Sequence, residues 1–419
     1  MYRTKTMNIV LGALFLLALI IGTLPPGRAA YPASYAVMAI GTIGLVSLGW
    51  SERSALRHPV ALSILCAIAL LSATVPLVYR SELDLMAPVF VLPMLTTIGM
   101  GFIGRATRWM PGPTLFAIIC LLAVTIAAIG GAYQALALNA GRVGLGNNPI
   151  HYGSLAAMVG GLSILGIVST KSPWRYIFIL GPILGVAATV LSGSRGPMAS
   201  ALGMTAVASI YLLISEWKDR VLRFSILTAL IIGVGAMLYL MLTSSYRVTA
   251  LLNAMDIFRF TGGSDDIRAA LFSSAAHAFQ SSPLYGLGFG QLMVTAQTLY
   301  PEFREIHRLE NLHADWANFA AMSGGMGLLA WLLLLLAPLS LMFNPSVRAD
   351  RPTALGAIIL VTGQTALGVS NAMFGVLPQT VLYAVALGYL FARALKLPES
   401  QQPSFDGGTR TPIHSLTPD

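Results

Sequence analysis

Apolar residues occur along this chain in blocks that are long enough to cross a membrane. A helix needs about 20 apolar residues to cross the hydrocarbon core, so each block predicts one transmembrane helix. The sequence therefore predicts an all-α integral membrane protein of about 12 transmembrane helices, the first nine in residues 1–242 and the last three in residues 313–396. The blocks lie at 7–24, 33–50, 59–79, 86–104, 114–138, 152–170, 175–191, 197–215, 222–243, 314–342, 353–372 and 377–395.

Two segments break this pattern. Residues 243–312 mix apolar and polar positions, as in 269–279, and predict one large external loop with short amphipathic helices over the mouth of the bundle. Residues 397–419 are polar and rich in Ser, Thr, Pro and Gln, so they predict a disordered cytoplasmic tail. The first apolar run is followed by Pro25-Pro26-Gly27 instead of a small-residue cleavage site, which indicates a retained first helix.

The composition is that of a membrane protein and excludes a soluble one. Hydrophobic residues make up 56% of the chain and charged residues 10%, whereas soluble domains carry about 25% charged residues. Cys66 and Cys120 lie inside apolar blocks, and we predict that both are buried structural thiols. No Cys/His cluster has the spacing of a zinc site, and we expect neither a metal nor another cofactor.

Basic residues indicate the orientation. With the N-terminus in the cytoplasm and alternating spans, 16 Lys and Arg residues fall inside and 9 outside, and 5 of those 9 lie in the long loop, which the positive-inside rule discounts. Both termini are therefore expected in the cytoplasm and the large loop on the opposite face. The net charge of +9 does not indicate nucleic-acid binding, because the basic residues are spread over short loops instead of forming one stripe.

The kind of basic residue also differs between the two faces. All four lysines fall inside, so every external basic residue is an arginine. A guanidinium offers a fixed fork of donors that matches phosphate and carboxylate oxygens, whereas an ammonium group is a mobile point charge. Four of the six histidines are also external, namely His151, His277, His307 and His313.

The strongest candidate for chemistry is His313, where the large loop enters the tenth predicted span. Near a helix N-terminus the dipole opposes protonation, which favours a neutral imidazole that can accept a proton. His313 is therefore a candidate general base, and the alternative is an interfacial histidine satisfied by loop backbone. Asp315 either complements the helix N-terminus or takes part in chemistry, and Glu310 would orient the imidazole if the helix extends that far.

Three external arginines are candidates for binding an anion. Arg195 lies in a tight turn between two spans, at membrane depth, beside Ser194 and the backbone donors that the glycines of this turn free. Arg142 lies in a Gly-rich loop before the sixth span, and Arg268 in the amphipathic part of the large loop. Each has a plainer alternative: a turn charge facing water for Arg195, ordinary loop chemistry for Arg142, and an ion pair with a neighbouring aspartate for Arg268.

Two observations bear on other functional classes. The run Gly286-Leu287-Gly288-Phe289-Gly290 is no nucleotide loop, because no predicted strand precedes it and no lysine accompanies it. We expect a flexible turn against the membrane there. No predicted span carries a carboxylate at mid-membrane, which argues against a proton- or ion-coupled pump and leaves a passive small-anion carrier as the competing class.

Taken together, these positions resemble the O-antigen ligase and O-antigen polymerase superfamily of bacterial membrane glycosyltransferases. The resemblance covers the architecture broadly and about residues 142–330 in detail. Ala314, Met322 and Phe272 depart from the usual pattern, and they bear on the subfamily. Four motifs carry the resemblance, in the right order and on one face: Arg142 before Asn148-Pro149, the turn Ser194-Arg195-Gly196, Arg268 before Pro283, Gly286 and Gly288, and His313 before Gly324 and Gly327.

The resemblance implies a GT-C-like fold in the bacterial inner membrane, among membrane lipids, with its active site facing the periplasm. It implies a glycan donor on undecaprenyl diphosphate, a diphosphate site made by Arg142, Arg195 and Arg268, and deprotonation of an acceptor sugar by His313. Ser194, Glu310 and Asp315 would support the site. The transfer would be inverting and independent of metal.

The acceptor distinguishes the members of this superfamily. An O-antigen ligase uses lipid A–core, a polymerase uses a second polyprenyl-linked repeat, and a protein O-oligosaccharyltransferase uses a pilin serine. The last class usually carries a sizeable soluble domain, which the sequence lacks. Chain length and the single large loop before His313 favour the ligase over the polymerase.

Overall fold

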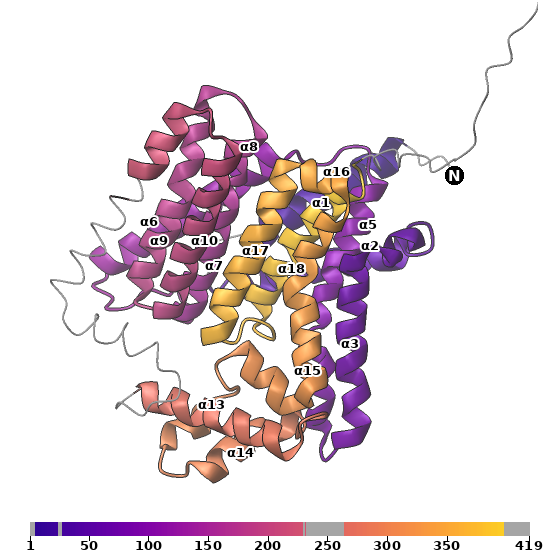
Figure 1. Cartoon of the computed structure of the whole chain (residues 1–419), viewed down its shortest axis with the longest axis vertical. Coiled ribbons are helices and arrows are strands. Elements are labelled where there is room, and N and C mark those ends of the chain that lie inside the picture. Colours follow the sequence, from indigo (N-terminus) through magenta and orange to yellow (C-terminus); the bar gives the residue numbers. More distant parts are fainter. Residues whose placement is uncertain (1–4, 24–26, 229–230, 232–263, 398–419) are drawn as a thin grey trace, which may run out of the picture.

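The computed structural model describes residues 5–23, 27–228, 231 and 264–397, and every regular element in these ranges is a helix (Figure 1). The long helices are α1 (Lys5–Gly22), α2 (Ala30–Leu48), α3 (Pro59–Val78), α5 (Leu95–Ala106), α6 (Pro113–Leu136), α7 (Pro149–Ser163), α9 (Leu180–Ser192), α10 (Arg195–Ser215), α13 (Ser264–Ser281), α15 (Asp315–Ser340), α17 (Arg351–Ser370) and α18 (Leu377–Ala394). The shorter elements are α4 (Met86–Val89), α8 (Leu165–Ser169), α14 (Leu292–Leu299), α16 (Pro345–Ala349) and the 3-10 turns η1 (Arg53–Arg57), η2 (Glu82–Leu85), η3 (Leu92–Met94), η4 (Pro173–Ile179), η5 (Phe289–Gln291), η6 (Arg304–Arg308) and η7 (Leu341–Phe343).

Ten helical segments in the described part of the chain are long and apolar enough to cross a membrane, and they correspond to ten of the predicted blocks. The block at 377–395 forms α18, which is not among those ten. The block at 222–243 lies mostly outside the described residues, as does the predicted tail at 397–419. The chain is thus a multi-pass membrane protein, while the number of twelve spans and the GT-C-like fold stay predictions.

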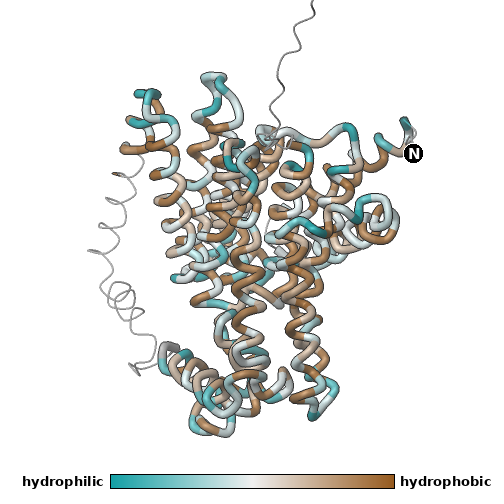
Figure 2. Tube along the Cα trace, turned by 45° about the vertical axis from the view of Figure 1, so that its right-hand side comes forward, coloured by the Kyte–Doolittle hydropathy of each residue, from teal (hydrophilic) through white to brown (hydrophobic). Residues whose placement is uncertain are grey.

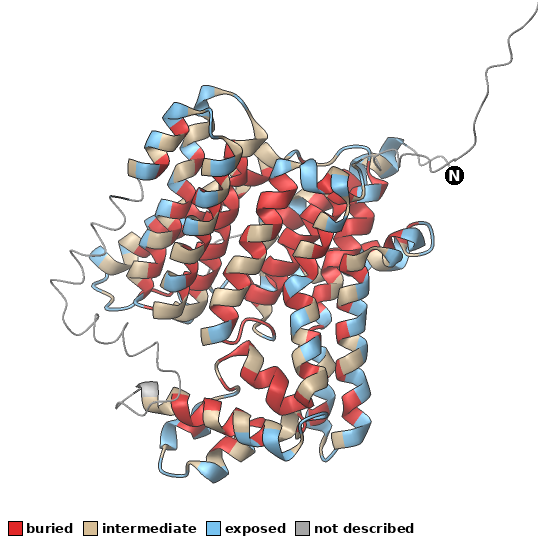
Figure 3. Cartoon of the chain, viewed as in Figure 1, coloured by how far each residue is buried: buried red, intermediate tan, exposed pale blue. Residues whose placement is uncertain are grey.

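Helix α18 lies at the centre of the bundle. Nearly all of its residues are buried, and it packs against α5, α17, α2, α1 and α7 (Figure 3). Between α2 and α5 the packing depends on small residues, because a Cβ at Gly99 would lie 1.9 Å from the carbonyl oxygen of Gly41. Close approach through glycine is a common way for helices to associate in lipid, where no hydrophobic effect drives them together.

The long helices of the bundle are largely hydrophobic along their length (Figure 2). Many of their apolar side chains are exposed on the flanks, as on a lipid-facing surface. On α6, Leu122, Ile126 and Ile129 are 57%, 55% and 65% exposed. Cys66 is exposed on α3 and Cys120 is buried in α6, so the prediction of buried thiols is confirmed for Cys120 and wrong for Cys66. Sequence hydropathy does not distinguish a lipid-facing position from a helix-facing one, because both are apolar.

The helices between residues 264 and 308 gather at one end of the bundle, where α13 and α14 lie across the first part of α15 (Figure 1). The short helices α8 and α16 lie at the opposite end (Figure 1). The remainder of the predicted large loop, residues 243–263, lies outside the described residues.

Helix α15 is broken at Gly324, which has φ +59° and ψ −140°. The segment 283–288 fills the break and hydrogen-bonds both halves. The Leu287 N–H donates to the Ala321 carbonyl at 2.8 Å, and on the other side the Gly325 N–H donates to the Pro283 carbonyl at 2.7 Å. Backbone groups freed within a membrane helix need such partners, because lipid offers none.

The Gly-rich run is therefore a packed part of the helix break and not the free turn that the sequence predicts. Gly286 has φ +71°, and a Cβ there would lie 2.5 Å from the backbone nitrogen of Ser323. The turn at Gly290 is held from η2, since the buried carboxylate of Asp84 accepts hydrogen bonds from the backbone of Arg80 at 2.9 Å and of Gly290 at 2.9 Å. Glycine is required in this run because backbone meets backbone there.

Candidate active site

His313 stands directly before α15 in an unusual backbone conformation, with φ +55°. Two asparagines hold it: the His313 N–H donates to the Asn311 side chain at 2.9 Å, and the Leu312 N–H donates to the fully buried Asn318 side chain at 2.8 Å. A non-glycine residue in this region costs on the order of 1–3 kcal/mol, and such residues cluster at functional sites. The strained backbone fixes where the imidazole lies.

The surroundings of His313 keep its imidazole neutral. Burial lowers the pKa of His313, and the guanidinium of Arg268 on α13 lowers it further. Protonation would place a positive charge on a ring that is already shielded from water and lies near a second cation. His151, in the first turn of α7, also lies within electrostatic range of His313. The structure thus brings together His313, Arg268 and His151 from three separate elements.

Arg142 is fixed against the turn that joins α9 to α10. Its Nε donates to the Ser192 carbonyl at 3.2 Å and its Nη2 donates to the Ser194 hydroxyl at 3.0 Å. The loop that carries Arg142 is itself tied down, because the Val143 N–H donates to the Leu191 carbonyl at 3.1 Å. Arg142 and Ser194, which the sequence singles out separately, are therefore in direct contact, although 52 residues separate the two in the chain.

Arg195 is the first residue of α10 and lies two residues after Gly193, which ends α9 in the left-handed region at φ +63°. The following Gly196 packs tightly on the end of α17, where a Cβ would lie 2.3 Å from the amide nitrogen of Asn371. The turn also abuts α7, because a Cβ on Gly153 would lie 2.8 Å from the Ser192 hydroxyl. His151 lies two residues before Gly153. Helix α7 therefore contacts the α9–α10 turn and also carries His151, which lies near His313.

Asp315 ties the start of α15 to the α17–α18 connection. Its fully buried carboxylate accepts hydrogen bonds from the backbone of Met373 at 2.7 Å and of Phe374 at 3.0 Å. The Asp315 carboxylate therefore binds the α17–α18 connection instead of the N–H groups of its own helix. Its role is structural. Glu310 is exposed and lies within electrostatic range of Tyr31 at the start of α2.

Several buried polar atoms around His313 have no hydrogen-bond partner among the described residues: His151 Nδ1, Asp315 Oδ2 and Asn318 Nδ2. Buried polar groups are nearly always paired, and unpaired ones in a native structure call for an explanation such as a ligand or an ordered water. All three unpaired atoms belong to residues that lie within a few residues of His313 in the chain or within its electrostatic range. They therefore mark a polar centre at this end of the bundle.

Sequence reasoning missed three contributors to this region. His151 appears in the sequence only as one external histidine among four, and Asn371 carries no signal at all. Arg28 packs on the Arg142 loop, since a Cβ at Gly146 would lie 3.0 Å from its side chain. The described residues contain no group of three or more His, Cys, Asp or Glu that could hold a metal ion.

These features define a multi-pass helical membrane protein with an arginine- and histidine-lined polar site at one end of its bundle. Residues 180–332, from α9 into α15, match the family model described as O-antigen ligase. This segment therefore matches a family of membrane enzymes of the glycosyltransferase-like type. The matched segment contains Ser194, Arg195, Arg268 and His313, whereas Arg142 precedes it. No curated protein matches the chain.

Proposed function

We propose that this protein is an O-antigen ligase of the bacterial inner membrane. It transfers a polysaccharide from undecaprenyl diphosphate to a sugar hydroxyl of lipid A–core. Both termini lie in the cytoplasm and the His313 site faces the periplasm, in agreement with the distribution of basic residues. The family match at residues 180–332 supports the general activity.

The observation that carries this proposal is the environment of His313. Its backbone is held at φ +55° by two asparagines, and both burial and Arg268 lower its pKa, so the imidazole is neutral near pH 7. A neutral imidazole beside guanidinium groups suits a reaction in which a hydroxyl loses a proton while a phosphate leaves.

In the proposed reaction the acceptor hydroxyl attacks the anomeric carbon of the donor sugar and its proton passes to His313. The new bond joins the acceptor oxygen to that carbon, and the bond between the carbon and the phosphate oxygen breaks. Undecaprenyl diphosphate leaves with the electron pair of the broken bond, and the configuration inverts. Arg142, Arg195 and Arg268 stabilise the charge that develops on the diphosphate.

Arg142 and Ser194 support this assignment because their mutual hydrogen bond leaves the rest of the Arg142 fork available. A guanidinium has five N–H donors, and the structure uses two of those of Arg142 to fix it to the turn. A pre-positioned guanidinium loses little entropy when it binds phosphate oxygens. Asp315 and Glu310 act at a distance, the first by holding the start of α15.

A polymerase would use the same donor and the same base, so a variant in cells separates the two activities. We expect a His313→Ala strain to accumulate uncapped lipid A–core while lipid-linked polymer of normal length still forms. His277→Ala, which changes an exposed histidine on α13, is the matched control and retains capping. Shortened lipid-linked polymer in the His313→Ala strain would assign the protein to the polymerases instead.

A further inference from the structure

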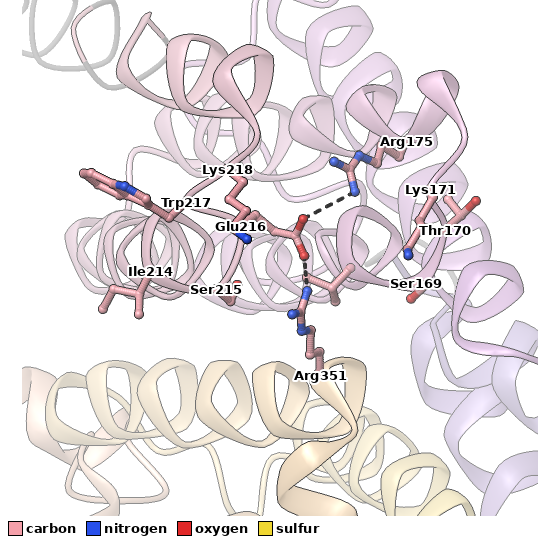
Figure 4. Close-up of a pocket in the computed structure, with 11 residues that line it drawn as sticks. Ser169, Thr170, Lys171, Arg175, Ile214, Ser215, Glu216, Trp217, Lys218 and Arg351 are labelled. Carbon is pink, nitrogen blue, oxygen red and sulfur yellow. Dashed lines mark hydrogen bonds and ion pairs between the residues drawn. The ribbon is translucent and has the colours of Figure 1, made fainter.

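A cavity of about 700 Å³ lies at the other end of α10 from Arg195 (Figure 4). Its walls come from the junction of α8 with η4, from the last residues of α10 and from the first residue of α17. Because α10 has 21 residues, the cavity is about 30 Å from Arg195. It is therefore separate from the site around His313.

Cationic side chains dominate the polar part of this cavity. Lys171, Arg175, Lys218 and Arg351 line it together with a single carboxylate, Glu216 (Figure 4). The cavity therefore carries an excess of positive charge, which attracts an anion.

Ion pairs engage only the two arginines. Glu216 pairs with Arg175 at 3.7 Å and with Arg351, and Asp219 forms a further ion pair with Arg175. The ammonium groups of Lys171 and Lys218 form no hydrogen bond or ion pair with any described residue. The buried Ser215 hydroxyl in the wall also has no partner among the described residues. Two ammonium groups and one hydroxyl thus remain to donate to an anionic ligand.

The position of the cavity indicates that this ligand is a lipid. Four candidate membrane spans have an end at or within four residues of the lining: Pro149–Ser169, Pro173–Ser192, Arg195–Ser215 and Arg351–Ser370. The cavity therefore lies where the hydrocarbon core meets water. Ile214 and Trp217 are 74% and 64% exposed, and they lie together on one side of the cavity, away from Lys171 and Arg175 (Figure 4).

Lys218 lies between Trp217 and Glu216 in the same view (Figure 4). Cations next to exposed apolar side chains match an amphiphile, which has a charged headgroup and acyl chains. Tryptophan favours the membrane–water interface, where its ring contacts acyl chains and its N–H reaches the headgroup level. Basic pockets between helices at a membrane boundary bind anionic headgroups. A free phosphate ion would use the cations and leave the apolar side uncovered.

We propose that this cavity binds the phosphate headgroup of an anionic phospholipid, such as phosphatidylglycerol, at the membrane boundary opposite to the His313 site. Lys171 and Lys218 pair with the phosphate, the Ser215 hydroxyl donates to one of its oxygens, and the acyl chains lie over Ile214 and Trp217. The bound lipid adds a link between the α8–η4 junction and the ends of α10 and α17, which ion pairs of Arg175 with Glu216 and Asp219, and of Arg351 with Glu216, also connect.

The experiment uses the purified full-length protein, delipidated in detergent and titrated with phosphatidylglycerol, phosphatidylcholine or inorganic phosphate, with bound lipid counted by native mass spectrometry. We expect phosphatidylglycerol to bind at least tenfold more tightly than phosphatidylcholine. Each basic residue near a membrane surface contributes roughly a fivefold factor, so Lys171→Gln with Lys218→Gln should weaken binding by about ten- to thirtyfold. Lys171→Arg with Lys218→Arg keeps both charges and should retain binding, which separates a lost site from a misfolded protein.

The matched control removes two exposed arginines that are close in sequence to the lining residues Lys218 and Arg351 but do not line the cavity, Arg220→Gln with Arg348→Gln. This control should stay within twofold of the wild type. Equal weakening in the control would overturn the proposal by reducing it to general surface charge. Equal binding of phosphatidylcholine, or competition by inorganic phosphate at the same concentration as the lipid, would also overturn it.

Discussion

The two ends of α10 hold similar numbers of cations and arrange them in opposite ways. At the Arg195 end the basic groups are arginines in tight turns, and Arg142 is fixed by two hydrogen bonds to the α9–α10 turn. At the Ser215 end two lysines line an open cavity without a partner among the described residues. The first arrangement fixes donors at definite points, as bond-breaking chemistry needs, whereas the second presents mobile charge, as lipid binding needs.

The backbone shows the same difference. Around His313 the chain adopts positive φ at His313, Gly193 and Gly324, and a second segment passes through the break in α15. The residues that line the cavity are absent from the set of positive-φ positions in the described part of the chain. A strained backbone conformation persists only where many surrounding contacts hold it. The backbone is therefore fixed more firmly at the His313 end than around the cavity.

The largest expected effect comes from His313→Ala. Loss of a general base lowers the turnover rate by about 10²–10⁴-fold, while binding of the lipid donor changes little. The measurement is glycan transfer by purified variants at saturating donor, with His277→Ala as the control on α13. Equal rates for His313→Ala and wild type would remove the functional distinction between the two ends of α10.

The next effect tests whether the break in α15 is a required structure. Gly286→Ala places a Cβ 2.5 Å from the Ser323 backbone nitrogen at a residue with φ +71°, which should lower the free energy of unfolding by at least about 2 kcal/mol. Gly203→Ala is the control, since a Cβ at this residue of α10 would lie 3.9 Å from its nearest neighbour, the Thr362 side chain of α17, and alanine favours a helix. Thermal unfolding in detergent measures both, and equal midpoints would show that the segment in the break tolerates a side chain.

A smaller effect tests the fixed fork of Arg142. Arg142→Lys keeps the charge and cannot reproduce the two contacts to Ser192 and Ser194, so we expect KM for the lipid donor to rise about tenfold. Arg304→Lys, at an exposed arginine of η6, should leave KM unchanged. If Arg142→Lys behaves as the control does, the arginines of this end act only as point charges, like the lysines of the cavity.

The smallest effect is a shift along the pH axis. Arg268 lowers the pKa of His313, so replacing it with Gln should raise that pKa. A protonated imidazole accepts no proton, so activity falls as pH drops through this pKa, and the acidic limb of Arg268→Gln should move to higher pH. Arg268→Lys keeps the charge and should leave the limb in place. The readout is the position of the limb in a pH–rate profile, and a limb that stays or moves to lower pH in Arg268→Gln contradicts the account.

Hydropathy was sufficient to predict the helical membrane architecture, because the ten long apolar helices in the described part of the chain follow directly from block length. It did not predict the break in α15. The residues around Gly324 are apolar on both sides, and only the three-dimensional approach of residues 283–288 shows why the helix stops and resumes.

The candidate site was partly predictable for a related reason. Arginines and histidines outside the membrane are rare enough to be singled out one by one, and the structure places Arg142 on Ser194 and Arg268 near His313. Contacts between distant elements carry no local signal, which explains why His151 was not connected with His313. Asp315 shows the same limit, since its hydrogen bonds go to Met373 and Phe374, more than 50 residues away.

Transfer by the purified protein tests the central claim most directly. Wild-type protein is incubated with an undecaprenyl-diphosphate-linked glycan and lipid A–core, with and without added magnesium, and the products are separated by size. We expect glycan-capped lipid A–core from the wild type in both conditions and almost none from His313→Ala. No transfer by the folded wild type in either condition would contradict this claim.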